Sequence, residues 1–201
     1  MNVLKKSLLA SAVALASATA VAEVSMTVGM VSDYVYRGSE LGDAGAYASI
    51  DYASGGFYAG VWTISDNTTA NSLEYDIYVG YDTEVAGVGL SLGYVAYEYT
   101  SAVSSEDEIT IGLSKGPISL TYVDGEADDG AGTDTDYEYL ILGADIGAFS
   151  FTYGEEDESG YDYMEVSTGT EVGAISLGVT LGGNSDGNDY LVLDMSTGVD
   201  L

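Results

Sequence analysis

Apolar and polar residues alternate strictly along many short segments of this chain. In residues 73–82 (LEYDIYVGYD) the odd positions are Leu, Tyr, Ile, Val and Tyr, whereas the even positions are Glu, Asp, Tyr, Gly and Asp. Residues 88–94 (VGLSLGY) alternate in the same way. A period of two is the period of a β-strand with one apolar and one polar face. A soluble β-sandwich and a membrane barrel both show this period, so other features must distinguish them.

The linkers between these segments alternate in length. Some are short (SGG, TEVAG, KGP, DIG and EVG), and the others are longer or more acidic (RGSELGDAG, SDNTTANS, SAVSSED, DGEADDGAGTDT, EEDESG and NSDGN). Short turns at one end and long loops at the other are typical of outer-membrane barrels, whereas Greek-key sandwiches mix their connections. We therefore predict an all-β fold, a single up-and-down antiparallel transmembrane β-barrel of 12 strands, at residues 24–37, 45–53, 57–64, 73–82, 88–100, 107–114, 118–124, 135–144, 148–154, 161–170, 174–183 and 189–199.

The first 22 residues have the composition of a secretory signal peptide. Lys5 and Lys6 precede an apolar stretch over residues 8–16, and the small residues Ala20-Val21-Ala22 follow it. That stretch is far shorter than the roughly 20 residues of a membrane-spanning helix. We expect cleavage before Glu23, which divides the chain into a signal peptide (1–22) and a barrel (23–201) in the outer membrane of a Gram-negative bacterium.

Charge and composition exclude several classes of function. Beyond residue 22 the chain has two basic residues, Arg37 and Lys115, against 33 acidic ones, a net charge of −31. This charge would repel nucleic acid. His and Cys are both absent, which removes the Ser-His and Cys-His arrangements of outer-membrane hydrolases. Carboxylate pairs such as Glu74 and Asp76 arise readily among so many acids, so we expect no enzymatic activity and no cofactor.

If the apolar faces of the strands meet lipid, their polar faces line the interior of the barrel. Glycines such as Gly29 and Gly80 share the polar face, which favours a roomy, wet lumen. Residues 135–144 are apolar on both faces, which leaves open either the register of that strand or a partly packed lumen. The candidate pore-lining residues are Asp33, Arg37, Asp51, Glu74, Asp76, Asp82, Glu108, Glu138 and Asp194.

Tyrosines gather at the ends of the predicted strands. Rings at such positions form the aromatic girdles at the two water interfaces of an outer-membrane barrel. Tyr75 and Tyr81, at opposite ends of one apolar face, fit both girdles. The loop-side girdle is predicted to contain Tyr34, Tyr36, Tyr94, Tyr122 and Tyr153.

Arg37 is the one basic residue predicted on the inner wall, four positions after Asp33 on the same face. It allows two interpretations. In one, its side chain crosses the lumen to pair with distant acids and shapes a constriction. In the other, it neutralises a local acidic cluster and holds the first strand in place. A lone cation among carboxylates pairs in either case, so the sequence leaves both open.

The acidic linkers suggest that this chain binds cations. DGEADDGAGTDTD (124–136) and EEDESG (155–160) offer carboxylate oxygens on flexible segments, as hard cations prefer. The first does not match an EF-hand loop, since Asp129 stands where Gly is needed. The irregular spacing favours solvated loops with loosely held divalent ions, which bridge to lipopolysaccharide phosphates, over a discrete metal site.

Three segments resemble a known family. SDYVYRGSE (32–40), SGGFYAGVWTIS (54–65) and EYDIYVGYD (74–82) are similar to the TorF-type porins of proteobacteria, a family of unknown function. The family pattern S-x-Y-x-[FY]-R-G-x-S is met by Ser32, Tyr34, Tyr36, Arg37 and Gly38, with Ser39 one place early. The chain departs from the family in having AGAYAS instead of a Pro-Ala pair, and in ending on Leu instead of the Phe common in such barrels. The resemblance implies a porin barrel and no particular substrate.

These features together predict an outer-membrane porin that passes small hydrophilic solutes. The wall acids and the negative field of its mouth would give it a preference for cations. The alternative is a closed-lumen barrel with a structural, adhesive or divalent-cation-binding role at the cell surface. Strand number does not decide, because about 8 strands are filled by side chains and about 16 to 18 leave an aqueous channel. The expected partners are outer-membrane lipid, lipopolysaccharide, and small solutes or cations.

Overall fold

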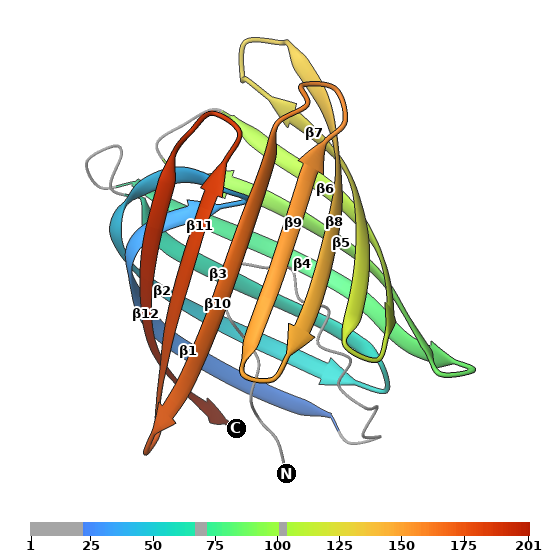
Figure 1. Cartoon of the computed structure of the whole chain (residues 1–201), viewed down its shortest axis with the longest axis vertical. Coiled ribbons are helices and arrows are strands. Elements are labelled where there is room, and N and C mark those ends of the chain that lie inside the picture. The colour runs from blue at the N-terminus through green and yellow to red at the C-terminus, as the bar shows by residue number, and fades with distance from the viewer. Residues whose placement is uncertain (1–21, 67–71, 101–103) are drawn as a thin grey trace.

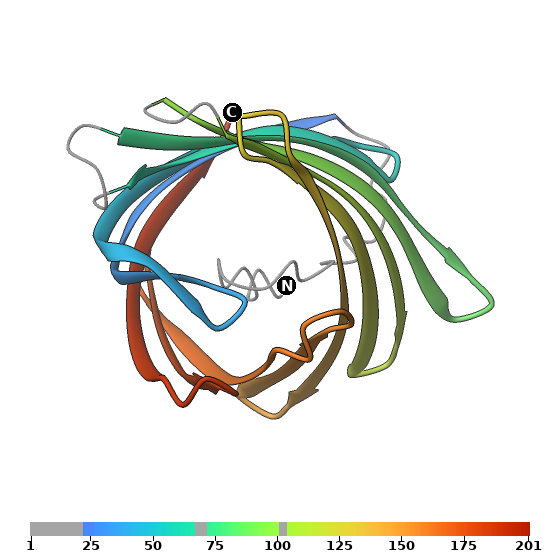
Figure 2. The ribbon, with the colours of Figure 1, turned by 90° about the horizontal axis from the view of Figure 1, so that it is seen from above.

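The computed structural model describes residues 22–66, 72–100 and 104–201. Each strand pairs antiparallel with its neighbour in sequence, and β1 also pairs with β12, which closes the barrel (Figure 1, Figure 2). This confirms the predicted fold class and strand number. The signal peptide predicted at residues 1–22 lies outside the described residues, apart from Ala22. The strands are β1 (Glu23–Tyr36), β2 (Ser39–Ser54), β3 (Phe57–Asp66), β4 (Ser72–Val85), β5 (Val88–Tyr99), β6 (Ser105–Lys115), β7 (Ile118–Asp128), β8 (Asp134–Ile146), β9 (Phe149–Glu156), β10 (Asp162–Val172), β11 (Ile175–Asn184) and β12 (Asp189–Asp200).

Tight turns join the strands at one end of the barrel. They are the two-residue connections 55–56, 86–87, 116–117, 147–148 and 173–174. Each contains a glycine with positive φ, which short β-hairpins need. At the other end the connections have four or five residues, except between β1 and β2. Among the described residues no helix is long and apolar enough to cross a membrane.

The connection between β1 and β2 differs from the predicted long linker. Only Arg37 and Gly38 form the turn, with φ of 48° and 78°, and β2 already begins at Ser39. Residues 39–43 pair with the end of β1, so they are strand instead of loop. Their sequence, SELGD, has no apolar alternation because this part of β2 does not form the wall of the barrel. The predicted loop at 124–136 is also shorter, since β7 runs to Asp128 and β8 begins at Asp134.

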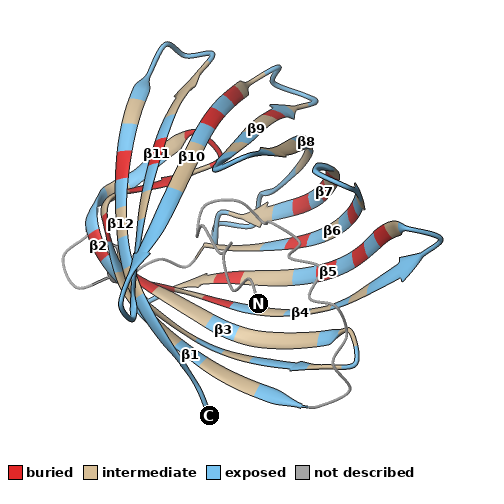
Figure 3. Cartoon of the chain, turned by 60° about the horizontal axis from the view of Figure 1, so that its bottom comes forward, coloured by how far each residue is buried: buried red, intermediate tan, exposed pale blue. Residues whose placement is uncertain are grey.

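The outer face of the barrel is apolar. Large side chains at alternate positions of every strand are exposed, among them Val28, Ile50, Ile77, Leu92 and Ile111. Figure 3 shows buried residues only as short separate patches along the strands. This is the reverse of a soluble domain, in which such side chains are inside. Alternation therefore points the apolar face outward, as expected for a barrel surrounded by lipid.

The first hairpin leaves the wall and turns into the barrel. β1 pairs with β12 only as far as Val31, and β2 pairs with β3 only from Tyr47. Beyond these points β1 and β2 pair only with each other, with a shift of register at Tyr34 and Val35. We call residues 32–46 the inner hairpin. In Figure 2 it is the light-blue hairpin that extends inward over the lumen.

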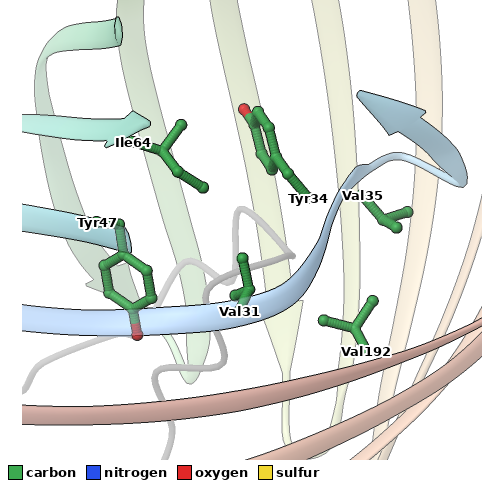
Figure 4. Packing of buried hydrophobic residues seen from close by; sticks show 6 residues of the cluster. All are labelled: Val31, Tyr34, Val35, Tyr47, Ile64 and Val192. Carbon is green, nitrogen blue, oxygen red and sulfur yellow. The ribbon is translucent and has the colours of Figure 1, made fainter. Parts of the chain in front are cut away.

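A small hydrophobic cluster lies where the inner hairpin joins the wall. Trp62 packs against this cluster, and its ring stacks on that of Tyr47 with 6.0 Å between the ring centroids. Tyr34 and Val35 of the hairpin pack here against Ile64 of β3 and Val192 of β12, and these contacts hold the base of the hairpin inside the barrel. The lumen is thus partly packed on this side. The cluster, shown in Figure 4, contains Val31, Tyr34, Val35, Tyr47, Ile64 and Val192.

Candidate functional site: a constriction in the lumen

The tip of the inner hairpin is held by an ion pair that crosses the lumen. The Arg37 guanidinium donates to both carboxylate oxygens of Glu108 on β6, at 2.6 and 2.9 Å. Arg37 is 5% exposed and Glu108 2% exposed. A bidentate pair of this kind combines charge attraction with a fixed orientation. Of the two interpretations that the sequence allowed for Arg37, the structure shows the pairing with a distant acid.

Aromatic rings enclose the Arg37 guanidinium. Its Cζ atom lies 4.6 Å from the ring centroid of Tyr36 and 4.7 Å from that of Tyr139. Both distances are within the range of a cation–π interaction. The Tyr137 hydroxyl donates to Glu108 at 2.9 Å, and the Tyr97 hydroxyl donates to the same carboxylate at 3.0 Å. Side chains of β6 and β8 thus bind Arg37 at the hairpin tip, and Tyr97 of β5 supports its partner Glu108.

Further hydrogen bonds fix the hairpin to other strands. Tyr34 donates to Glu74 on β4 at 2.8 Å, and Asn184 on β11 donates to the Gly38 carbonyl at 2.8 Å. The Tyr161 hydroxyl, just before β10, donates to the Arg37 carbonyl at 3.2 Å. The tip is therefore anchored around much of the barrel, which makes the inner hairpin a structural candidate for a constriction. Arg37 is held with positive φ, which is uncommon for a residue other than glycine.

Beside the hairpin, the loop end of the barrel has a cavity of about 510 Å³. Ser39 of the hairpin, Tyr139 of β8 and Tyr161 line it, together with Glu156 and Asp186. Two of the residues that line this cavity, Glu156 and Asp186, are acidic.

Most of the predicted lining residues lie on the inner face. Asp51 accepts from Tyr78, and Ser49 also donates to it at 2.7 Å. Asp82 accepts from Ser91 at 2.6 Å. Asp194 accepts from Tyr47 at 2.7 Å. Glu74, Asp76 and Glu108 are buried within the barrel, and Asp33 is half-buried in the inner hairpin.

Three predicted positions differ in the structure. Glu138 alternates with the inward Tyr137 and Tyr139, and it shares its face with Leu140, which is exposed, so it points outward. The strand predicted at 135–144 is thus apolar on both faces because Tyr137 and Tyr139 on its inner face pack around the Arg37–Glu108 pair. Tyr34 and Tyr36, predicted in the outer girdle, instead lie inside because the hairpin that carries them leaves the wall.

The remaining loop-side tyrosines of the predicted girdle lie on the outer face. Tyr94 donates to Asp107, and Tyr153 donates to Glu155 at 3.1 Å. Tyr122 shares the face of the exposed Ile118. These rings thus share the apolar outer face near the loops, where interfacial tyrosines lie.

The inner glycines have a role that the sequence alone did not reveal. Each of six glycines faces a tyrosine on the next strand, and a Cβ atom there would lie 2.2 to 2.5 Å from the nearest atom of the tyrosine side chain. The tyrosine ring therefore covers the glycine and lies along the wall instead of projecting into the lumen. Glycine in a strand often marks such a close approach. The pairs are Gly29–Tyr47, Gly60–Tyr78, Gly80–Tyr58, Gly125–Tyr137, Gly154–Tyr163 and Gly182–Tyr190.

Two inner acids, the half-buried Glu106 and the buried Glu165, were not predicted as lining residues. Glu106 precedes Glu108 by two positions on β6, and Glu165 on β10 accepts from Tyr190 at 2.8 Å. Alternation with Met164 and Val166 is the signal that could have identified Glu165, and for Glu106 the signal is its position two residues before Glu108.

The acidic connection between β7 and β8 is organised by its own backbone. Asp129 accepts from the amides of Ala131 at 2.7 Å and Thr133 at 3.1 Å, which lowers the pKa of its carboxyl group. Among the described residues, no group of three or more Asp and Glu side chains has the arrangement of a metal site.

Comparison with known proteins gives a family and a fold. A family model described as "Bacterial protein of unknown function (Gcw_chp)" matches residues 15–147. Two structures of KdgM porin, one in complex with disordered oligogalacturonate, are 10% and 9% identical, with TM-scores of 0.54 and 0.53. The alignments cover 89% of this chain and 97% of each porin chain.

A third structure, from work on the in-meso crystallisation of membrane proteins, has a TM-score of 0.58 and 9% identity. It covers 89% of this chain and 84% of the other. No curated protein sequence matches the chain. At these identities the likeness concerns the barrel fold.

Proposed function

Since this chain belongs to the bacterial family of unknown function Gcw_chp, we propose a function from the barrel itself: an outer-membrane diffusion channel, constricted by the inner hairpin, that prefers cations. The solutes would be small and hydrophilic, because the hairpin and its apolar cluster occupy part of the lumen. The fold shared with the KdgM porin supports the location and the channel class. A signal peptide at residues 1–22 remains part of this proposal.

The charge balance of the inner wall carries the proposed selectivity. The Arg37 cation is matched by Glu108, and the other basic residue beyond residue 22, Lys115, is exposed at the end of β6. Four inner acids, Asp51, Asp82, Glu165 and Asp194, accept hydrogen bonds from the hydroxyls of Tyr78, Ser91, Tyr190 and Tyr47. A hydroxyl donor leaves the carboxylate charge in place, so the lumen attracts cations and repels anions.

A lipopolysaccharide contact is the second part of the proposal. On the outer face near the loops, Asp124 faces Glu138 across the strands, and Glu126 faces both Asp107 and Asp136. Like charges directly opposite in a sheet repel one another. Loosely held divalent cations would relieve this repulsion and bridge to the phosphates of lipopolysaccharide.

A closed-lumen barrel with a structural, adhesive or cation-binding surface role is the second candidate. The observation that favours it is the anchored hairpin, whose tip bonds to strands on several sides of the lumen. In this case the barrel would be stable but would not conduct.

The experiment is to insert residues 23–201, refolded in detergent, into planar bilayers. The channel proposal expects discrete conductance steps. Its control is the same preparation boiled before addition, which should give none. If the protein migrates as a folded, heat-modifiable barrel on gels yet gives no steps, the channel proposal fails and the closed barrel stands.

A further inference from the structure

One carboxylate of the inner wall lacks a hydrogen-bond donor. Asp76 on β4 is 9% exposed, and its Oδ1 atom has no partner among the described residues. An ionised carboxylate kept from water is costly unless a cation or a donor approaches it. Every other inner acid described above has a hydroxyl or the Arg37 guanidinium as its donor, or lies in a less buried position, so Asp76 is distinct.

Asp76 belongs to a row of alternating rings and carboxylates. Strand register places Trp62 of β3 directly opposite Asp76 on one side and Tyr97 of β5 on the other. The next strand continues the row with Glu106. Neighbouring strands are about 4.8 Å apart, so successive members of the row lie within reach of a single small molecule. The indole Nε1 of Trp62 is likewise buried without an acceptor.

The composition of this row selects the chemistry of a ligand. Two carboxylates favour a positive charge, and aromatic rings on both sides of Asp76 favour a cation that is weakly hydrated. A hard divalent ion would need about six or more oxygen ligands. The described acids do not form a group that could hold a metal.

The protein itself supplies an example of such binding. The Arg37 guanidinium is bound between the rings of Tyr36 and Tyr139 and against the Glu108 carboxylate. The row at Asp76 has the same elements, two rings and a buried carboxylate, and its Oδ1 atom has no donor among the described residues. We propose that the row Trp62–Asp76–Tyr97–Glu106 is a binding subsite for a small organic cation with N–H donors, such as an alkylguanidinium. The proposal rests on the proposed function, since it names a solute class for that lumen.

The probe is the fluorescence of Trp62, the single tryptophan of the chain. Refolded protein in detergent is titrated with millimolar methylguanidinium chloride, and separately with sodium chloride at the same ionic strength. We expect a saturable change in Trp62 emission with methylguanidinium that sodium does not produce. An equal response to both salts, or a response that never saturates, overturns the proposal.

A matched pair of variants locates the subsite. Asp76→Asn should weaken methylguanidinium binding by about tenfold or more, since it removes a charged hydrogen-bond acceptor. Glu84→Gln removes the same charge from an exposed position at the far end of β4 and should bind as the parent does. Equal affinities in the two variants overturn the proposal. If Asp76→Asn does not refold, Glu106→Gln takes its place in the comparison.

This experiment is independent of conduction. Conductance with no saturable Trp62 response would reject the subsite and leave the channel standing. A saturable response without conductance would reject the channel and leave an organic-cation site inside a closed barrel.

Discussion

At the scale of single residues, the Arg37–Glu108 pair fixes the inner hairpin. Both side chains are buried, and their contact joins residues that are 71 positions apart. The net contribution of such a pair to stability is small, because each charge loses its hydration. Removing only one partner is different, since it leaves the other charge buried and unpaired.

We therefore predict that Arg37→Met destabilises the barrel by about 3–5 kcal/mol. The measurement is urea unfolding in detergent, followed by the loss of the heat-modifiable band. The double variant Arg37→Met/Glu108→Met should recover most of that loss, because no unpaired charge remains. Lys115→Met removes the same charge from an exposed position and should stay within about 0.5 kcal/mol of the parent. Equal stability of Arg37→Met and Lys115→Met would contradict the buried pair.

The glycine–tyrosine contacts make a second prediction at this scale. A Cβ at Gly60 would lie 2.5 Å from the hydroxyl oxygen of Tyr78, so Gly60→Ala must push that ring into the lumen. We expect a lower single-channel conductance and a stability loss of about 1–3 kcal/mol. Adding Tyr78→Ala should restore the conductance.

Gly178→Ala is the control for this substitution. Its Cβ would meet that of Asp194 at 3.4 Å, an ordinary contact, so both conductance and stability should be unchanged. If Gly60→Ala behaves like Gly178→Ala, the position of the Tyr78 ring along the wall does not depend on the glycine that it covers.

At the scale of elements, the strands of the wall could be predicted and the inner hairpin could not. β5 was predicted at 88–100 and runs over Val88–Tyr99, and β11 was predicted at 174–183 and runs over Ile175–Asn184. Contact with lipid on one face imposes the alternation that reveals such strands. Residues 39–43 pair with the end of β1 in the inner hairpin instead of forming the wall, and so they lack that signal.

Some residues of the candidate site could likewise be predicted from the sequence, and others could not. Alternation identified Asp51, Glu74 and Asp194 as inner residues because their neighbours face lipid. It misassigned Glu138, because Tyr137 and Tyr139 make the inner face of β8 apolar as well. The partner of Arg37 depends on how far the hairpin reaches across the barrel, and no pattern local to one strand contains that distance.

If the inner hairpin constricts the lumen, removing it should widen the channel. Replacing Asp33 through Asp43 with Asn-Gly leaves Ser32 and Ala44 beside a two-residue turn that suits a hairpin. We expect a folded barrel with a larger single-channel conductance than the parent. The control is a conservative change at an outward position, Val28→Ile, which should conduct as the parent does. A shortened variant that is heat-modifiable but conducts no more than the parent would show that the hairpin is not the constriction.

At the scale of the whole molecule, two surfaces of opposite character define the protein. The outer wall is apolar on every strand, and the inner wall carries carboxylates whose charge only Arg37 offsets among the described inner residues. A barrel that presents the apolar surface to lipid would enclose a negative lumen. Selectivity is then a property of the enclosed charge as a whole rather than of one residue.

The central claim is that this lumen conducts and prefers cations, and the most direct measurement is the reversal potential of the refolded barrel across a planar bilayer with a potassium chloride gradient. The account predicts a reversal potential near that of potassium, which moves toward zero in the triple variant Asp51→Asn/Asp82→Asn/Asp194→Asn. A reversal potential on the chloride side would contradict it.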